Sequence, residues 1–166
     1  ASANLKPDLI LINNTNKKDE LYESLAKIAP TVVTEGTGIN WKQDFLLIAA
    51  ALGTTEKAEK LMEEYTTKAK SVGQKAGTEK TFSFLYASAD RTRIFAKSSF
   101  VGSICQDASL ARPAAAQVEK TSIDLSSEQL DQADGDYLFY GVQGGDESKL
   151  TGEALWSTLK AVTEKH

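Results

Sequence analysis

Two arginines, Arg91 and Arg93, flank a single threonine in a polar turn that follows an apolar run at 82–86. A guanidinium group binds a carboxylate, catecholate or hydroxamate oxygen through parallel N–H donors. Alternation along a short strand would place both side chains on one face. The turn is therefore the first candidate for a binding site, and a solvated turn arginine is the alternative for each residue taken singly.

Further candidates lie where predicted elements begin or end. Ser98 and Ser99 either cap the helix that Phe100 opens or direct their hydroxyls into a cleft. Phe100 either stacks on a ligand or enters the core. Tyr140 and Gln143 stand at the end of an apolar run, and ligands of open α/β sheets bind beyond the carboxyl ends of the strands.

Residues for covalent or metal-based catalysis are scarce. His166 is the only histidine and the last residue, and Cys105 is the only cysteine. Serine–histidine catalysis, cysteine–histidine pairs and histidine zinc sites are therefore excluded. Cys105 falls inside a helical apolar pattern, so we expect a buried packing residue rather than a nucleophile. The sequence predicts no resident metal and no covalently bound cofactor.

Two other motifs give weaker signals. The chain contains no G-x-G-x-x-G and no G-K-[ST], so nucleotide binding is poorly supported. Asp134-Gly135-Asp136 lacks the later glutamate of an EF-hand loop and is interpreted as a turn.

Bulk properties narrow the classes of partner. The 166 residues carry a net charge of −4, and 41% of them are hydrophobic, as in a soluble globular protein. An acidic chain without a basic stripe is not expected to bind nucleic acid. No apolar run approaches the ~18 residues that span a membrane. The chain is cytosolic, or it is exported and has lost its signal peptide.

The first elements predict one β-α-β unit. The run LILI at 9–12 suits a strand buried on both faces, a helix follows over 17–29 and ends before Pro30, and TVVT at 31–34 suits a second strand. One such unit does not make a stable sheet alone. We therefore expect the tail of a lobe.

A long helical region begins at Trp41, which we expect to be core rather than a ligand platform. Its apolar stripe continues through Leu61 to Val72, interrupted at Gly53. A helix running between two lobes would explain its length. The alternative is a pair of helices that meet at Gly53.

The remainder alternates between strands and helices. It predicts a strand at 82–86, a hairpin piece at 93–96, a helix that ends before Pro113, a short strand at 114–118, a short helix at 125–130, a buried strand at 137–140 and a helix at 151–162. Such alternation predicts an α/β fold of three layers, with a mostly parallel sheet.

Five segments in this order resemble a known family. LKPDLILI, PTVVT, ALGTTEKAEKLMEEY and FSFLYASADRTRIFAKSSFVGSICQDASLARP, followed by TSIDLSSEQLDQADGDYLFYG, resemble the class III periplasmic binding proteins of iron–siderophore, haem and cobalamin ABC importers. The resemblance covers roughly 5–162. It implies two α/β lobes joined by a long helix, with ligand held between them.

The resemblance also implies boundaries and extent. We expect 1–38 to be the end of the N-terminal lobe, 39–76 the interlobe helix and 77–166 the C-terminal lobe. The family's first strands, last helix and acylated N-terminal cysteine are missing, which predicts a fragment whose lipid anchor lies outside the chain. An extracytoplasmic location is implied, in the periplasm or on the surface of a Gram-positive cell.

The resemblance assigns roles residue by residue. It places Arg91, Arg93, Ser99 and Phe100 near the cleft, together with Tyr140 and Gln143. Glu128, in S-x-E-x-L, resembles the glutamate that docks on permease arginines, with helix capping as the alternative. The implied function is capture of a ferric siderophore without chemistry. The alternatives are haem or cobalamin binding, a small-metabolite enzyme or sensor, and an interaction fragment without a ligand.

Overall fold

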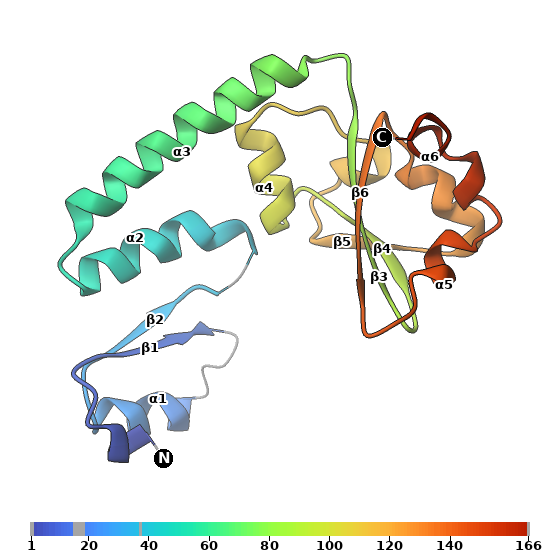
Figure 1. Ribbon diagram of the computed structural model, residues 1–166. Coiled ribbons are helices and arrows are strands. Elements are labelled where there is room, and N and C mark those ends of the chain that lie inside the picture. The colour runs from blue at the N-terminus through green and yellow to red at the C-terminus, as the bar shows by residue number, and fades with distance from the viewer. Residues whose placement is uncertain (1, 15–18, 37, 166) are drawn as a thin grey trace. The chain divides into compact units, whose positions relative to one another are not determined.

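The structure is a computed structural model that describes residues 2–14, 19–36 and 38–165 (Figure 1). The chain divides between Tyr65 and Thr66 into two compact units, which are described separately below. The α/β class that the sequence predicts is confirmed in both units. The strands of each unit form a separate sheet.

The first unit contains the predicted β-α-β arrangement. After a 3-10 turn η1 (Ser2–Leu5), strand β1 (Ile10–Asn13) leads through α1 (Asp19–Ala26) to β2 (Thr31–Thr34). The two strands are parallel, with Ile10 opposite Thr31. The predicted helix start at 17 lies outside the described residues. The prediction that β1 is buried on both faces is wrong. Leu11 of β1 is 41% exposed, because its sheet has only two described strands.

A buried carboxylate shapes the loop after β2. Asp44 is 8% exposed, and its two oxygens accept hydrogen bonds from the backbone N–H groups of Glu35 at 2.8 Å and Gly36 at 3.1 Å. Buried charge is tolerated only where such donors satisfy it. Asp44 therefore serves the loop and is not free to bind a ligand.

The long helical region is two helices. After the short turn η3 (Gly38–Asn40), α2 (Trp41–Ala51) ends, and α3 (Thr55–Ala76) begins beyond Gly53, whose φ of 66° favours glycine. The rings of Trp41 and Tyr65 meet edge to face at 5.0 Å between centroids. The two-helix alternative is therefore correct, and Trp41 packs between these helices.

The second unit is built on a four-stranded sheet of order β5-β4-β3-β6. Its strands are β3 (Phe82–Ser88), β4 (Thr92–Phe95), β5 (Ser122–Leu125) and β6 (Tyr137–Gln143). β3 and β6 are parallel, whereas β3–β4 and β4–β5 are antiparallel. The predicted parallel pairing is thus found between β1 and β2 and between β3 and β6. The pairings of β4 with β3 and with β5 are antiparallel.

Three predictions for this unit are wrong. The segment at 114–118 contains a 3-10 turn, η4 (Ala114–Gln117), because three alanines after a proline favour helical backbone over a strand. The strand at 137–140 is not buried, since β6 is an edge and Phe139 is 52% exposed. The helix at 151–162 is broken into α5 (Ser148–Thr151), η6 (Trp156–Thr158) and α6 (Lys160–Glu164), the first of which ends at Gly152.

One face of the sheet, called the core face here, carries the apolar core. The side chains of Leu85 and Ile94, 2% and 0% exposed, pack there against Leu130, Leu150 and Leu159. These leucines come from η5 (Ser127–Ala133) and from the segments after β6. The core face is therefore closed by short helical turns rather than by one long helix.

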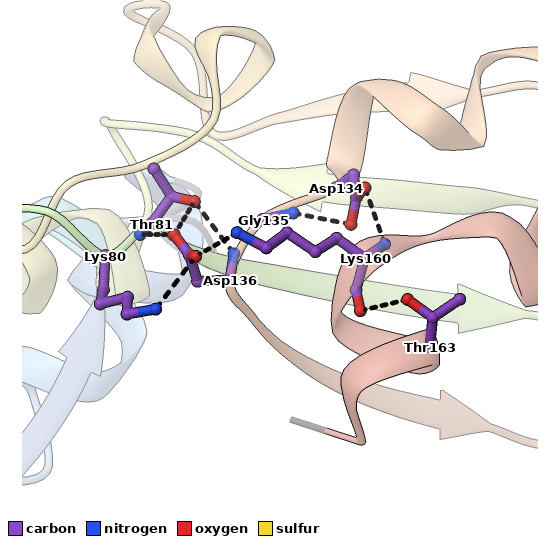
Figure 2. A network of polar contacts seen from close by, with 7 residues as sticks. All are labelled: Lys80, Thr81, Asp134, Gly135, Asp136, Lys160 and Thr163. Carbon is purple, nitrogen blue, oxygen red and sulfur yellow. Dashed lines mark hydrogen bonds and ion pairs between the residues drawn. The ribbon is translucent and has the colours of Figure 1, made fainter.

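A polar network fastens α6 to the start of β3 and β6 (Figure 2). The Asp136 carboxylate accepts hydrogen bonds from the Thr81 N–H at 2.8 Å, from the Thr81 hydroxyl at 3.1 Å and from Lys160 Nζ at 2.7 Å. Asp134 Oδ2 accepts the backbone N–H of Lys160 at 2.8 Å. The predicted turn at 134–136 thus connects α6 to the strands, and these contacts of Asp134 and Asp136 are called the polar clamp below.

Helix α4 (Phe100–Asp107) is held by close backbone approaches. Ser99 caps it: the hydroxyl accepts from the N–H of Gly102 at 2.8 Å and donates to the Ala96 carbonyl at 2.7 Å. A side chain on Gly73 of α3 would meet the carbonyl oxygen of Ala108 at 1.7 Å. Glycine at 73 therefore lets α3 lie directly against the C-terminal end of α4.

Candidate functional site

The strand ends of the second unit gather several candidates. β3 and β6 are parallel neighbours, so Ser88 and Gln143 end them side by side, and the β3–β4 turn with Arg91 follows at the same edge. This is the edge at which α/β sheets commonly bind ligands. The two faces of the sheet present different chemistry at this edge.

The face opposite the core, called the aromatic face here, carries stacked rings. Phe82 lies parallel to Tyr137 at 5.1 Å, and Phe84 lies parallel to Phe139 at 5.0 Å between centroids. Alternation along β3 places these rings opposite the buried Leu85. Such pairs add stability beyond their buried area. They form a row along the two strands, and the Arg112 guanidinium lies over the Phe84 ring at 5.4 Å.

A polar cluster ends this row of rings. The Arg93 guanidinium lies over the Tyr86 ring at 4.7 Å, and Phe95 lies 6.1 Å from the same ring. The Tyr86 hydroxyl donates a hydrogen bond to Gln143 Oε1. Arg93 Nε is buried and has no hydrogen-bond partner among the described residues. The structure thus brings together Arg93 and Gln143, which are far apart in sequence, through Tyr86.

Arg91 extends this cluster. Its side chain is 48% exposed and pairs with Asp124 at 3.7 Å. Asp124 is also the register partner of Arg93 on β5, and such partners share a face of the sheet. Both arginines therefore neighbour the same carboxylate. Arg91, Arg93, Tyr86, Gln143 and Asp124 are called the guanidinium cluster below.

Arg91 also lines a depression of about 570 Å³ that reaches toward the core face. Other charged residues along it are Lys149 and the acids Asp90, Asp146 and Glu153. The Ser88 hydroxyl donates to Asp90 at 2.7 Å, and this hydrogen bond lowers the pKa of that carboxyl. Acids outnumber cations here, so the depression is less suited to an anionic ligand than the guanidinium cluster.

The remaining candidates are placed differently. Ser99 is 3% exposed and its hydroxyl is occupied by the helix cap, which is one of the two roles that the sequence leaves open. Phe100 is 48% exposed at the start of α4, so it does not enter the core. About half of its surface therefore faces solvent.

Tyr140 does not join the cluster. It lies opposite Leu85 in register and so on the core face, where its ring meets Trp156 edge to face at 5.1 Å. Its hydroxyl donates to Glu147, and this hydrogen bond raises the pKa of Tyr140. Gln143 is three positions further along β6 and thus faces the other way.

The last candidates are Glu128, Cys105 and any group of acidic side chains that could bind a metal. Glu128 is exposed on η5, where Ser126 and Gln129 form the capping pair. Cys105 is 2% exposed, and burial raises the pKa of its thiol, as expected for a packing residue. Within the described ranges, no three His, Cys, Asp or Glu side chains gather as a metal site would require. No helix there is long and apolar enough to cross a membrane.

Sequence reasoning missed three members of this surface. The sequence predicts Tyr86 and Phe95 only as parts of strands and makes no prediction for Asp124, yet the three form the contacts that place Arg93. The aromatic residues at every second position, Phe82, Phe84 and Tyr86, were a sequence signal that these rings share one face of the strand. The pairing of β4 with β5, which brings Asp124 to the arginines, had no local signal.

Comparisons with known proteins agree on one family. The family model described as "Periplasmic binding protein" matches residues 2–166. The probable siderophore-binding lipoprotein YfiY of Bacillus subtilis is 33% identical over 98% of this chain and 55% of its own length. The iron(3+)-hydroxamate-binding protein FhuD of the same organism is 30% identical, again over 98% and 55%.

A solved structure shows the same fold. Staphylococcus aureus SirA complexed with staphyloferrin B is 28% identical, with a TM-score of 0.81 over 99% of this chain and 62% of SirA. The chain thus spans about half the length of the curated relatives and under two thirds of this structure. The match over nearly every residue, together with the α/β units and their order, shows that the chain belongs to the periplasmic binding protein family.

Proposed function

We propose that the chain is part of the substrate-binding component of an ABC importer, which captures a ferric siderophore and delivers it to a permease without chemical change. The observation that carries this is the guanidinium cluster, where cationic N–H donors lie beside a row of rings at the strand ends. The relatives' names, siderophore-binding and iron(3+)-hydroxamate-binding, support the same ligand class.

Within this proposal the contacts to the ligand come from Arg91, Arg93, Phe100 and Gln143. Ser99 contributes by fixing the start of α4 beneath Phe100. Tyr140 supports β6 from the core face. The N-terminal 38 residues would belong to one lobe and those from 77 onward to the other, with the helical region between them.

Delivery requires a docking surface as well as a ligand site. Glu128 is exposed on η5 and is proposed to meet a permease arginine. Its neighbours in the capping pair hold the turn, so a Glu128→Gln change should leave the fold intact. We propose an extracytoplasmic location with anchoring through a lipid outside the chain, as the lipoprotein name of YfiY suggests for the family.

Titration of the complete protein that contains this chain tests the ligand proposal. Ferric siderophores, haem and cobalamin are added in turn while tryptophan fluorescence is followed. Saturable quenching by a ferric siderophore is expected, with affinity reduced roughly 10- to 100-fold in Arg93→Gln, the scale of a charge-assisted hydrogen bond of about 1.5–3 kcal/mol. Lys70→Gln, an equal charge change at an exposed site on α3, is the control.

Each outcome is informative. Quenching by haem or cobalamin alone would replace the siderophore by that ligand. No response to any of them from a folded protein would refute the proposal. Transport by Glu128→Gln should fall while ligand affinity stays unchanged, and a Glu128 variant that transports normally would remove the docking role.

A further inference from the structure

Arg112 is a buried cation on the aromatic face. Only 8% of its surface is exposed, and its guanidinium lies over the Phe84 ring. No ion pair among the residues that the structure describes includes Arg112, and its Nη1 is buried without a hydrogen-bond partner there. Burial of such a charge costs free energy, and an apolar side chain of similar size is often at least as stable in its place. Stability alone therefore does not explain an arginine at this position.

The hydrogen bonds that the Arg112 side chain donates join β3 to β4. Its Nε donates to the carbonyl of Phe82, the first residue of β3, at 3.3 Å. Its Nη2 donates to the carbonyl of Phe95, the last residue of β4, at 2.7 Å. The pairing of the two strands ends at Leu85 and Ile94, so both carbonyls lie beyond the last pair. The guanidinium thus links the strands where their own ladder has stopped.

The backbone around Arg112 is itself anchored. The N–H of Phe82 donates to the Ala111 carbonyl at 2.9 Å, and Ala111 forms an isolated parallel bridge with Thr81. The Arg112 carbonyl accepts a hydrogen bond from Gln117 Nε2 at 3.3 Å. Because these contacts involve β3 and η4 but not β4, they fix the start of the Arg112 side chain independently of β4.

Phe95 connects Arg112 to the guanidinium cluster. The Phe95 carbonyl accepts from Arg112, and the Phe95 ring lies 6.1 Å from the Tyr86 ring on which Arg93 rests. Strand β4 has only four residues, and Arg93 is two positions before Phe95 on the same face. A constraint on the last residue of so short a strand also constrains Arg93.

We infer that Arg112 is a positioning residue for ligand binding, which holds β4 where the Arg93 guanidinium rests on Tyr86. The inference rests on the proposed function and adds a residue that acts on the same surface without touching the ligand. An arginine that is held in place beforehand loses less side-chain freedom when a ligand binds. Loss of Arg112 should therefore weaken binding through Arg93 rather than through unfolding.

Arg112→Met in the complete protein that contains this chain separates these two effects. Methionine fills a similar space but removes the charge and both donors. Ferrichrome, ferric enterobactin and ferric citrate are titrated in turn, and the chelate that binds the parent most tightly is the probe. Its affinity should fall roughly 3- to 10-fold, the scale of ordering one long side chain on binding. Tm should stay the same or rise, because an unpaired buried charge has been removed.

A double-mutant cycle with Arg93→Gln tests whether Arg112 acts through Arg93. In the Arg93→Gln background, Arg112→Met should change the affinity by less than about 2-fold, because the side chain that it positions is absent. Arg112→Lys keeps the charge but lacks the planar fork that reaches two carbonyls. It enters the same cycle with the same expectation, and it supplies the result if the methionine variant does not fold.

Leu159→Val is the matched control, because Leu159 is 1% exposed and belongs to the core face of the same unit. It should lower Tm and leave the affinity unchanged. An unchanged affinity in Arg112→Met, equal losses in the two Arg93 backgrounds, or an equal loss in Leu159→Val overturns the inference and leaves the proposed function standing. Binding of none of the three chelates by the folded parent refutes the proposed function, and the inference with it.

Discussion

At the scale of single residues, Asp136 has the most partners in the polar clamp. Its side chain is 11% exposed and receives donors from Lys160, from Thr81 and, at 3.5 Å, from Lys80. The hydrogen bond from Lys160 and that from the Thr81 N–H hold the pKa of Asp136 far below its usual range. The same pair raises the pKa of Lys160.

The Asp136 clamp should make stability sensitive to acid. A carboxyl whose pKa is lower in the folded state stabilises the fold above its unfolded pKa of about 3.9, and this contribution is lost as the pH falls toward the folded value. Asp136→Asn should therefore lower Tm at pH 7, and the difference from the parent should narrow below about pH 4.

Thermal melts of both proteins from neutral to acid pH measure this effect, with Asp131→Asn as the control on an exposed turn. A difference in Tm that is constant across the whole range would contradict the assignment of the lowered pKa to this clamp.

Cys105 gives a second prediction at the residue scale. Because the thiol is 2% exposed and burial raises its pKa, the reactive thiolate is scarce in the folded protein. Reaction with a disulfide reagent should be at least roughly 100-fold slower than in denaturant, where the side chain is free. Fast labelling of the native protein would show that α4 opens readily.

At the scale of elements, the contact between α3 and α4 depends on Gly73. A Cβ there would lie 1.7 Å from the Ala108 carbonyl oxygen, and backbone cannot move aside cheaply. Gly73→Ala should destabilise the fold by about 1–3 kcal/mol, the usual range for overpacking, despite the better helix propensity of alanine. Denaturant unfolding of the variant provides the measurement.

Gly53→Ala is the comparison for Gly73→Ala, because it introduces backbone strain without a steric clash. Gly53 has a φ of 66°, but a Cβ at this position would have no heavy atom within 4 Å, so the substitution should cost only the left-handed penalty of about 1–2 kcal/mol. Should Gly73→Ala prove neutral instead, the close approach of α3 and α4 would be wrong.

At the scale of the whole molecule, the two units differ in how completely they bury their large aliphatic side chains. In the first unit Leu5, Leu46 and Leu52 are exposed, Leu5 by 80%, and its sheet has two described strands. In the second unit Ile94 and Leu85 are almost completely buried. Local stability follows such burial, so the units should open with different free energies.

Hydrogen exchange on the intact chain tests this difference. Amides of β1 and β2 should exchange at least roughly 10-fold faster than those of β3 and β4, which lie over the apolar core. Equal protection in both sheets would mean that the first unit is stabilised by contacts other than those described within it.

The positions of most helices and strands were predictable from local periodicity. Their burial and their neighbours in the sheet were not. The strand at 31–34 and the helix starts at Trp41 and Phe100 have the predicted positions, because caps, prolines and apolar spacing set them locally. The burial of β6 was mispredicted because its edge position depends on strand order. The sequence predicted only part of the guanidinium cluster for the same reason. Arg91 and Arg93 are close in sequence, whereas Asp124 comes next to them only through the pairing of β4 with β5.

The position of β6 has a practical consequence for anyone who purifies this protein. β6 spans seven residues at the border of its sheet and displays Phe139, which is 52% exposed, beside a row of backbone groups that β3 does not occupy. Such borders recruit further strands from other molecules. Concentration rather than temperature should then limit how long a sample remains clear, which turbidity measured at rising protein concentration checks.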